Sequence, residues 1–397
     1  MLIKNISVLY GKELEYIKHT NMRISGQFID KLDSTLTPHQ KERVYDCEGL
    51  LAIPGFVNSH THVGDSIAKD IGIEYGVEKK IHPVKGFKQK ILQNTKPSHL
   101  CSFIRTSCIA MMKKGITTFV DFREGGFEGI VTLQKAISHL PIRSIILGRL
   151  NYYQDYQLIK KNTSLPEFKK IELSKLLQKC NGLGISGPNE NSDSVLRYYS
   201  QTKKLRAIHS SETSESCKIS KKITGKTETQ RAMFLKPNFL IHMTHASKKD
   251  LLLASKNGSS IVVCPRANAS LAEGIPDVNL MTDCGCNITI GTDNVMINSP
   301  DMFREMDYLW KISMATKKKR ISPKSILKMT TVNAGKMLQN KKIGSIQQNN
   351  LADCIFIDKH QIDLEPMHDP YASIVHRASE TTIAAVMIGG KIVHGKI

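Results

Sequence analysis

Helix and strand patterns alternate through the middle of the chain. Apolar residues recur at helical spacing from Leu100 to Met111, within a segment from Ser98 to Lys114 that ends at Gly115. Short apolar runs with the length of buried strands come before and after such segments. There are eight of these runs: Ile53–His62, Ile116–Asp121, Ile142–Leu147, Gly182–Ser186, Leu205–His209, Phe239–His242, Ser260–Cys264 and Asn287–Ile290. Eight strand and helix units in succession predict an α/β fold, a (β/α)₈ barrel.

Both ends of the chain show a different pattern, made of short strands and turns. The strand patterns are Leu2–Leu9, Met22–Ile29 and Glu48–Ile53 near the start, and Asp353–Ile357 and Ile383–Val393 near the end. Within the last run, Gly389-Gly390 predicts a hairpin turn. We therefore expect residues 1–53 and 341–397 to form one small β-sandwich, beside a barrel made of residues 54–340.

The composition is that of a globular protein with a basic surface. The 397 residues are 40% hydrophobic, enough for a large core, and the formal net charge is +20. Lysines occur in short, scattered groups such as Lys79-Lys80 and Lys221-Lys222, without a nucleic-acid-binding motif and with only 6% aromatic residues. We therefore expect a solvated lysine-rich surface and no nucleic-acid partner, while a preference for anionic small substrates stays open.

The first residues and the cysteines bear on where the protein works. The run from Met1 to Tyr10 alternates like a strand and lacks the apolar core of a signal peptide. No later apolar run reaches membrane-spanning length. The nine cysteines are odd in number and mostly scattered, which favours reduced thiols over a disulfide framework. These features predict a cytoplasmic protein without a membrane partner.

Polar side chains with catalytic potential follow the predicted strands. In a strand that ends at His62, His60 and His62 point to the same face, because side chains alternate. That pair alone is a weak signal, but further candidates follow the other strands: Asp121, Glu124, Arg149, Asn151, Asn189, Glu190, His209, Glu212, His242, His245, Arg266, Asn268 and Asp293. A barrel brings strand ends to one rim. There, His209 and Asp293 would complete a site for Zn²⁺ or Fe²⁺.

Short motifs at these strand ends, taken together, resemble one known family. They run in order through the whole chain: Pro54–His62, Gly115–Thr118, His209–Glu212, Ile241–His245, Cys264–Asn268, Gly291–Asn294, Gly344–Ile346 before Ala352-Asp353, and Gly389–Val393. This set resembles the amidohydrolase superfamily, in its branch of metal-dependent deaminases and chlorohydrolases. The joint match is specific for the superfamily and much less specific for a substrate.

The resemblance implies a metal site and three catalytic residues. Its metal ligands would be His60, His62, His209 and Asp293, holding one divalent ion, Zn²⁺ or Fe²⁺, that makes water acidic enough to give hydroxide. Asp293 would also accept a proton from this water. Glu212 would carry a proton to a substrate ring nitrogen and then to the leaving group, and His242 would orient the attacked carbon or the hydroxide. Two-metal relatives carry a bridging lysine on the fourth strand, and Gly182–Pro188 has none, which favours one metal.

Residues that contact the substrate are harder to assign. The candidates are Asp65, Glu124, Asn189, His245, Arg266 and Asn268. For Asp65 a surface-loop role is an equal alternative, His245 fits a structural role as well, and Arg266 and Asn268 fit hydrogen bonds that fix their loop. The segment Val63–Asp70 differs from its counterpart in S-adenosylhomocysteine and guanine deaminases. We therefore expect this segment to contact the substrate and to determine specificity.

These inferences predict an enzyme that deaminates an amino-substituted nitrogen heterocycle of purine, pyrimidine or pterin type. One alternative is hydrolysis of a cyclic amide or imidazolone by the same water. Another is a barrel that serves only as a scaffold, which would be marked by lost metal ligands, whereas all four candidates are present. Apart from the small heterocyclic substrate, the expected partner is a second copy of the chain. The resemblance implies this, since the superfamily often forms dimers or larger assemblies.

Overall fold

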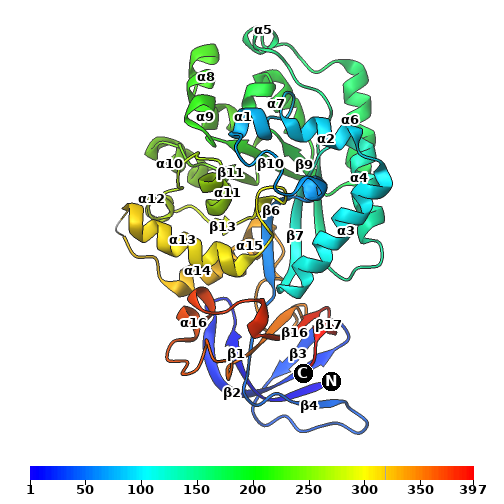
Figure 1. The fold of residues 1–397 in the computed structure, drawn as a ribbon, viewed down its shortest axis with the longest axis vertical. Helices are drawn as coiled ribbons and strands as arrows, with labels where there is room; N and C mark the ends of the chain where they lie inside the picture. Colours follow the sequence, from blue (N-terminus) through cyan, green and yellow to red (C-terminus); the bar gives the residue numbers. More distant parts are fainter. Residues whose placement is uncertain (318) are drawn as a thin grey trace.

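The larger of two sheets in the computed structural model, which describes residues 1–317 and 319–397, is entirely parallel (Figure 1). Its strand order is β13-β12-β11-β10-β9-β8-β7-β6-β14. The strands are β6 Phe56–His62, β7 Ile116–Arg123, β8 Arg143–Gly148, β9 Gly182–Ile185, β10 Leu205–Ser210, β11 Phe239–His242, β12 Ser260–Val263, β13 Ile288–Ile290 and β14 Asp293–Asn294. All eight predicted strand regions are therefore present in the order expected.

The eighth predicted strand is divided in two, and this division closes the barrel. β13 pairs with β12. After a gap of two residues, β14 pairs with β6. Gly291 lies in the gap, where a Cβ would come within 2.7 Å of the Cβ of His60. Any larger residue would push the eighth strand away from the first. The predicted (β/α)₈ barrel is thus confirmed, and Gly291 permits the close approach that completes it.

Helices surround the barrel strands in Figure 1. They are α1 Val77–Lys80, α2 Phe87–Asn94, α3 Pro97–Lys113, α4 Gly126–Ile137, α5 Tyr156–Lys160, α6 Glu167–Lys179, α7 Asp193–Tyr199, α8 Ser214–Thr224, α9 Glu228–Ala232, α10 Lys248–Lys256, α11 Pro265–Ser270, α12 Val278–Asp283, α13 Met302–Lys317, α14 Pro323–Met329, α15 Val332–Met337 and α16 Pro370–His376, with 3₁₀ helices η1 Val63–Ala68, η2 Pro188–Glu190, η3 Met233–Leu235 and η4 Glu380–Thr382. None of the helices in the described ranges has the length and apolarity needed to cross a membrane.

The second sheet is mostly antiparallel and combines both ends of the chain, as predicted. Its order is β17-β16-β15-β5-β1-β2-β3, with β4 beside β1. The strands are β1 Leu2–Tyr10, β2 Glu15–Ser25, β3 Phe28–Leu32, β4 Val44–Asp46, β5 Leu50–Pro54, β15 Cys354–Asp358, β16 Ile383–Ile388 and β17 Lys391–Gly395. Gly389 and Gly390, both with positive φ, form the predicted hairpin turn. The single strand predicted over Met22–Ile29 is wrong, because the chain reverses at Gly26 between β2 and β3.

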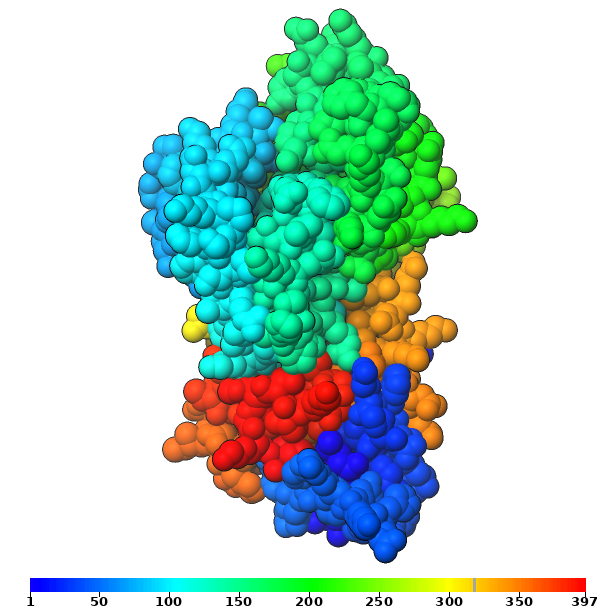
Figure 2. Space-filling view, turned by 90° about the vertical axis from the view of Figure 1, so that its right-hand side faces the viewer, coloured from blue at the N-terminus to red at the C-terminus, as the bar shows by residue number. Residues whose placement is uncertain are grey.

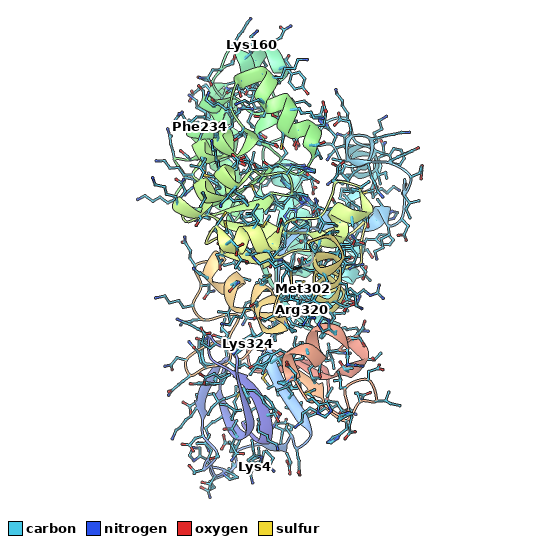
Figure 3. The ribbon with its side chains drawn as sticks, turned by 90° about the vertical axis from the view of Figure 1, so that its left-hand side faces the viewer. Lys4, Lys160, Phe234, Met302, Arg320 and Lys324 are labelled. Atoms are coloured by element: carbon cyan, nitrogen blue, oxygen red, sulfur yellow. The ribbon has the colours of Figure 1, made fainter. Side chains whose placement is uncertain are left out.

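The terminal sheet lies against the end of the barrel where its strands begin. Gly55, just before β6, donates a backbone hydrogen bond to the Asp353 carbonyl at 2.9 Å. Arg143, at the start of β8, places Nη1 3.0 Å from Oδ2 of Asp353. Figure 2 shows the two chain ends side by side at the base, and Figure 3 places Lys4 and Lys160 at opposite ends of the molecule. The carboxyl ends of the barrel strands therefore face away from the terminal sheet. Active sites of such barrels form at these carboxyl ends.

Candidate metal and active site

Two histidines at the end of β6 face a carboxylate on the neighbouring β14. His60 and His62 are buried, with 0% and 4% of their surface exposed. In the β6–β14 register Asp293 pairs with Thr61, the residue between them. Its Oδ1 lies 3.2 Å from Nε2 of His60 and 3.6 Å from Nε2 of His62. The same-face geometry predicted for the two histidines thus directs both toward Asp293.

His209 and His242 complete a cluster with the composition of a metal site. Nε2 of His209 lies 3.3 Å from Nε2 of His60. Ligand atoms of His60, His62 and His209 all lie within 4.8 Å of one another, and so do those of His60, His242 and Asp293. The second oxygen of Asp293, Oδ2, is buried and has no hydrogen-bond partner among the residues that the structure describes. Converging imidazole nitrogens and a free carboxylate oxygen fit a divalent cation such as Zn²⁺ or Fe²⁺.

The protonation states of this cluster suit metal binding. Burial lowers the pKa of His60 to about 3 and also lowers the pKa of His209. Both imidazoles are therefore neutral near pH 7 and keep a lone pair for a cation. Burial alone would raise the pKa of Asp293, but its hydrogen bond with His60 and its electrostatic interactions with the surrounding imidazoles bring the pKa below the ordinary value. Asp293 is therefore an anion.

Hydrogen bonds to the other ring nitrogens orient two of the histidines. Nδ1 of His209 lies 3.0 Å from the carbonyl oxygen of Ile185. Nδ1 of His62 lies 2.7 Å from Oε1 of Glu124, and that carboxylate also accepts a hydrogen bond from Lys88 at 2.8 Å. Contacts of this kind fix the ring and leave Nε2 for a metal. Glu124 was predicted to contact substrate, but the structure places it behind His62.

Glu212 and His242 form a pair beside the metal-binding cluster. Oε1 of Glu212 lies 3.5 Å from Nε2 of His242, and Nδ1 of His242 lies 3.2 Å from Oδ1 of Asn268. Burial raises the pKa of Glu212, which favours the protonated carboxyl that a general acid needs. His242 and Asp293 have φ values of 71° and 61°, a left-handed conformation that costs a non-glycine residue roughly 1 kcal/mol or more. Such strain is common at active sites.

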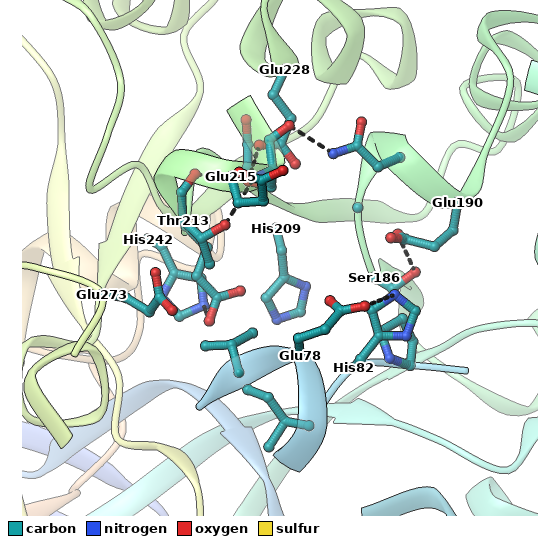
Figure 4. A pocket seen from close by; sticks show the side chains of 18 of the residues that line it. Glu78, His82, Ser186, Glu190, His209, Thr213, Glu215, Glu228, His242 and Glu273 are labelled. Carbon is teal, nitrogen blue, oxygen red and sulfur yellow. Dashed lines mark hydrogen bonds and ion pairs between the residues drawn. The ribbon is translucent and has the colours of Figure 1, made fainter. Parts of the chain in front are cut away.

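A cavity of about 510 Å³ opens onto this cluster. His62, His209, Glu212, His242 and Asp293 all contribute to its wall. Figure 4 shows His209 and His242 in this wall. Among the residues predicted to contact substrate, Asn189 also lines it, while the other five do not. The structure therefore brings together all the predicted metal ligands and catalytic residues, and it separates most of the predicted substrate contacts from the cavity.

Several residues outside the cavity wall fix loops instead. Both oxygens of Asp65 accept hydrogen bonds from the segment after β13, one from Asn294 Nδ2 at 2.7 Å and one from the Met296 backbone at 3.0 Å. Asn268 holds His242, as described above. Arg266 contacts Glu305 at 3.3 Å, and His245 contacts the Glu273 carbonyl oxygen at 2.7 Å. These contacts agree with the alternative roles in loop structure.

The cavity wall also contains residues that sequence reasoning missed. None of the residues 63–70 lines the cavity, while the next segment contributes Val77, Glu78, Ile81, His82, Pro83 and Lys88. Glu228 joins from the first turn of α9, and Glu190, which had been noted only as a strand-end residue, joins from η2. The only local signal at Glu228 is the helix-capping pattern from Thr227 to Gln230, which predicts a helix start and no site.

The charge of the cavity differs from that of the whole chain. Its wall carries the carboxylates of Glu78, Glu190, Glu212, Glu215, Glu228, Glu273 and Asp293, against the two basic residues Lys88 and Arg149. An acidic wall repels anions even in a protein of net charge +20. The structure therefore gives no support to a general preference for anionic substrates.

Comparisons with known proteins agree with this architecture. Residues 51–393 match the model described as "Amidohydrolase family". A protein of Methanothermobacter thermautotrophicus is 34% identical over 397 residues, which cover 99% of each chain. The 5-methylthioadenosine/S-adenosylhomocysteine deaminase of Clostridium tetani is 27% identical over 415 residues, covering 100% of this chain and 94% of the deaminase. The zinc complex of atrazine chlorohydrolase TrzN from Arthrobacter aurescens TC1 has the same fold, with a TM-score of 0.84, 16% identity, and coverage of 99% and 95%.

Proposed function

Because this chain belongs to the amidohydrolase family, we propose that it removes an amino group from a nitrogen heterocycle by hydrolysis at one divalent metal ion, Zn²⁺ or Fe²⁺. The substrate would be an amino-substituted ring of purine, pyrimidine or pterin type. Water replaces the amino group, so the products are the oxo-substituted ring and ammonia. The similarity to a deaminase over the full length of the chain supports this reaction.

The main support for the proposal is that Glu212, His242 and a cluster with the composition of a metal site lie at the same cavity. The cluster consists of His60, His62, His209 and Asp293, with Glu212 and His242 3.5 Å apart beside it. A catalytically inactive scaffold has no need for this combination of neutral imidazoles and a carboxyl whose pKa is raised. Hydrolysis at a ring carbon needs both an activated water and a proton donor.

The proposed mechanism assigns a separate task to each side chain. A divalent cation held by His60, His62, His209 and Asp293 would supply water of lowered pKa at neutral pH. Asp293 stays ionised, and its unpartnered Oδ2 accepts the proton that the attacking water loses. His242 donates from Nδ1 to Oδ1 of Asn268, which leaves Nε2 as an acceptor that orients the water.

Glu212 supplies the proton that the ring requires. Its protonated carboxyl donates to the ring nitrogen next to the attacked carbon, so that no negative charge accumulates there. The carboxylate then takes up a proton from the new hydroxyl and passes it to the amino group. The proton that Asp293 accepted from the water returns to Glu212 at the end of the cycle, so both side chains regain their starting states. The carbon–nitrogen bond breaks as ammonia leaves, and the ring carbonyl forms. Because Glu212 lies 3.5 Å from His242, it reaches the same face of the substrate as the water.

A screen of amino-heterocycles with metal-loaded protein tests this proposal. The expected result is ammonia release together with a product in which oxygen has replaced the amino nitrogen in an intact ring. Protein stripped with a chelator is the matched control and should be inactive until metal returns. A product that has gained water and opened its ring without ammonia release would favour cyclic amide hydrolysis, and absence of turnover on every ring class would overturn the proposal.

A further inference from the structure

Two carboxylates, one buried and one partly exposed, lie in the cavity wall apart from the proposed proton donor. Glu190 belongs to η2 and Glu228 to the first turn of α9. Figure 4 shows Glu190 and His242 on opposite sides of His209, with Glu228 above them. The proposed chemistry at His242 and Glu212 therefore has no use for this second acidic region.

The two carboxylates have only neutral partners. Oε2 of Glu190 accepts a hydrogen bond from Oγ of Ser186 at 3.1 Å. Oε2 of Glu228 accepts from the backbone of Ser211 at 2.9 Å and from Oγ of Ser216 at 2.8 Å. Within the described ranges neither carboxylate makes an ion pair. Burial raises the pKa of both, that of Glu228 to about 7. Neither carboxylate is therefore in direct contact with a cationic side chain of the described residues.

The glycine at position 187 lines the cavity and lies close to both carboxylates. A Cβ on Gly187 would lie 3.0 Å from Oε2 of Glu190 and 3.8 Å from Oε1 of Glu228. The two carboxylates therefore lie near the same backbone position of the cavity wall. A side chain at position 187 would crowd Oε2 of Glu190.

Asn189 provides an independent sign that a hydrogen-bond donor is absent here. Its side chain lines the cavity and is only 9% exposed. Its Nδ2 donates to the Ser216 carbonyl at 2.9 Å, whereas its Oδ1 is buried and has no partner in the described part of the chain. Buried acceptors are rarely left unpaired in folded proteins. Asn189 precedes Glu190 in η2, and its Nδ2 contacts Ser216, whose Oγ donates to Glu228, so this unpaired oxygen belongs to the same part of the wall as the two carboxylates.

The basic residues of the cavity wall do not neutralise this region. Nζ of Lys88 lies 2.8 Å from Oε1 of Glu124, and Nη2 of Arg149 lies 4.0 Å from the same oxygen. Both charges are thus directed at Glu124, behind His62. His82, Arg149 and the buried Arg231 do act on Glu190 at longer range and lower its pKa somewhat, but burial outweighs them.

We propose that Glu190, Glu228 and Asn189 form a subsite for a protonated amine carried on a side arm of the heterocyclic substrate. An ammonium group has three N–H donors and a positive charge, which match three acceptor side chains and two carboxylates. This inference rests on the proposed function, because it describes the substituent on the ring that is deaminated.

The test compares three substrates that differ only in the side arm attached to the same adenine ring. Adenine carries an aminopropyl, a hydroxypropyl or a carboxyethyl arm on its imidazole nitrogen, and kcat/KM is measured for each with metal-loaded protein. The aminopropyl compound should exceed the hydroxypropyl compound by about tenfold, mostly through KM, because a charge-assisted hydrogen bond is stronger than a neutral one. In the Glu190→Gln/Glu228→Gln double variant this preference should disappear. A hydroxyl or carboxylate arm that performs as well as the amine overturns the subsite.

A binding measurement separates this inference from the proposed reaction. Calorimetry with the hypoxanthine forms of the same three compounds needs no turnover. Tighter binding of the amine that disappears in the double variant supports the subsite even if no amino ring is hydrolysed. Equal binding of all three, or no binding, overturns it even if deamination is observed. Asn189→Leu, which removes one acceptor, should weaken amine binding alone, and the exposed Glu128→Gln is the matched control.

Discussion

Oε1 of Glu124 lies 2.7 Å from Nδ1 of His62, so a carboxylate on the loop after β7 fixes a candidate metal ligand on β6. The same oxygen accepts a hydrogen bond from Lys88 on α2 at 2.8 Å. Burial alone would raise the pKa of Glu124, but Lys88 and His62 hold it well below its ordinary value. A helix outside the barrel therefore reaches the metal site through one ionised carboxylate.

This arrangement predicts that Glu124→Gln weakens metal binding without removing a ligand. A neutral amide orients the His62 ring less strongly and gives it less basicity, so the metal affinity should fall about 10- to 100-fold. Competition with a chromogenic chelator measures the change. Glu128→Gln, on the exposed face of α4, should bind metal like the parent protein. Equal affinities for Glu124→Gln and the parent would contradict a role for Glu124 in holding His62.

Replacement of Glu212 by glutamine should separate catalysis from metal binding. The amide keeps the shape of the side chain but cannot deliver a proton, so kcat should fall by about 10² to 10⁴ while metal content stays the same. Ammonia release and metal analysis on the same preparation provide the two measurements. The matched control is Glu167→Gln, at an exposed site on α6. Full activity of Glu212→Gln would remove its role as proton carrier.

Asn268 should affect turnover through His242. Its Oδ1 lies 3.2 Å from Nδ1 of His242, and its Nδ2 donates to Oγ1 of Thr244 at 3.1 Å. Asn268→Ala leaves a buried imidazole nitrogen without its partner, which costs about 1 to 3 kcal/mol. We expect kcat to decrease about tenfold or more, with metal affinity unchanged. Asn257→Ala, at the exposed end of α10, should have no effect on either quantity, and an unchanged kcat for Asn268→Ala would contradict the positioning role.

Removal of the metal should lower the thermal stability of the protein. The candidate ligands converge only in the folded chain, so a bound ion stabilises the native state by about 4 kcal/mol at a free concentration 1,000 times Kd. Chelation should therefore reduce Tm by several degrees, and addition of Zn²⁺ or Fe²⁺ should restore it. The His60→Ala/His62→Ala variant provides the comparison, since chelator and metal should both leave its Tm unchanged. A parent Tm that is insensitive to both treatments contradicts the site.

Stability should also depend on pH through Glu228. Burial raises the pKa of this carboxyl from 4.5 to about 7, and the charges of Glu190 and Glu212 add to the effect, while hydrogen bonds from Ser216 and Ser211 oppose it. The folded state therefore holds this proton more tightly than the unfolded state. Its contribution to stability is full below about pH 4.5 and is lost as the pH rises to about 7 and above.

The Glu228→Gln variant tests this dependence because glutamine does not titrate. Its Tm should fall less than that of the parent protein between about pH 5 and pH 8. The exposed Glu167→Gln control should follow the parent curve over the whole range. A parallel decrease for Glu228→Gln and the parent would show that this carboxyl does not carry the pH dependence.

The sequence by itself determined the barrel and the centre of its candidate site. Each predicted strand depends on a local run of apolar residues, and the placement of His60 and His62 on one face follows from the two-residue period of a strand. Motifs at the strand ends then marked His209, Glu212, His242 and Asp293. These residues converge because parallel strands in a closed barrel must end at one rim.

Only the tertiary structure decided which other side chains reach the cavity. Asp65 is turned away because its partner Asn294 lies 229 residues further along the chain. Lys88 and Glu124 are brought together from separate elements, and Glu190 and Glu228 meet around Gly187. Local patterns cannot encode such pairs, since the path of each loop depends on packing against distant segments. The sequence therefore predicted the metal-binding cluster, and long-range contacts determined the charge and shape of the cavity above it.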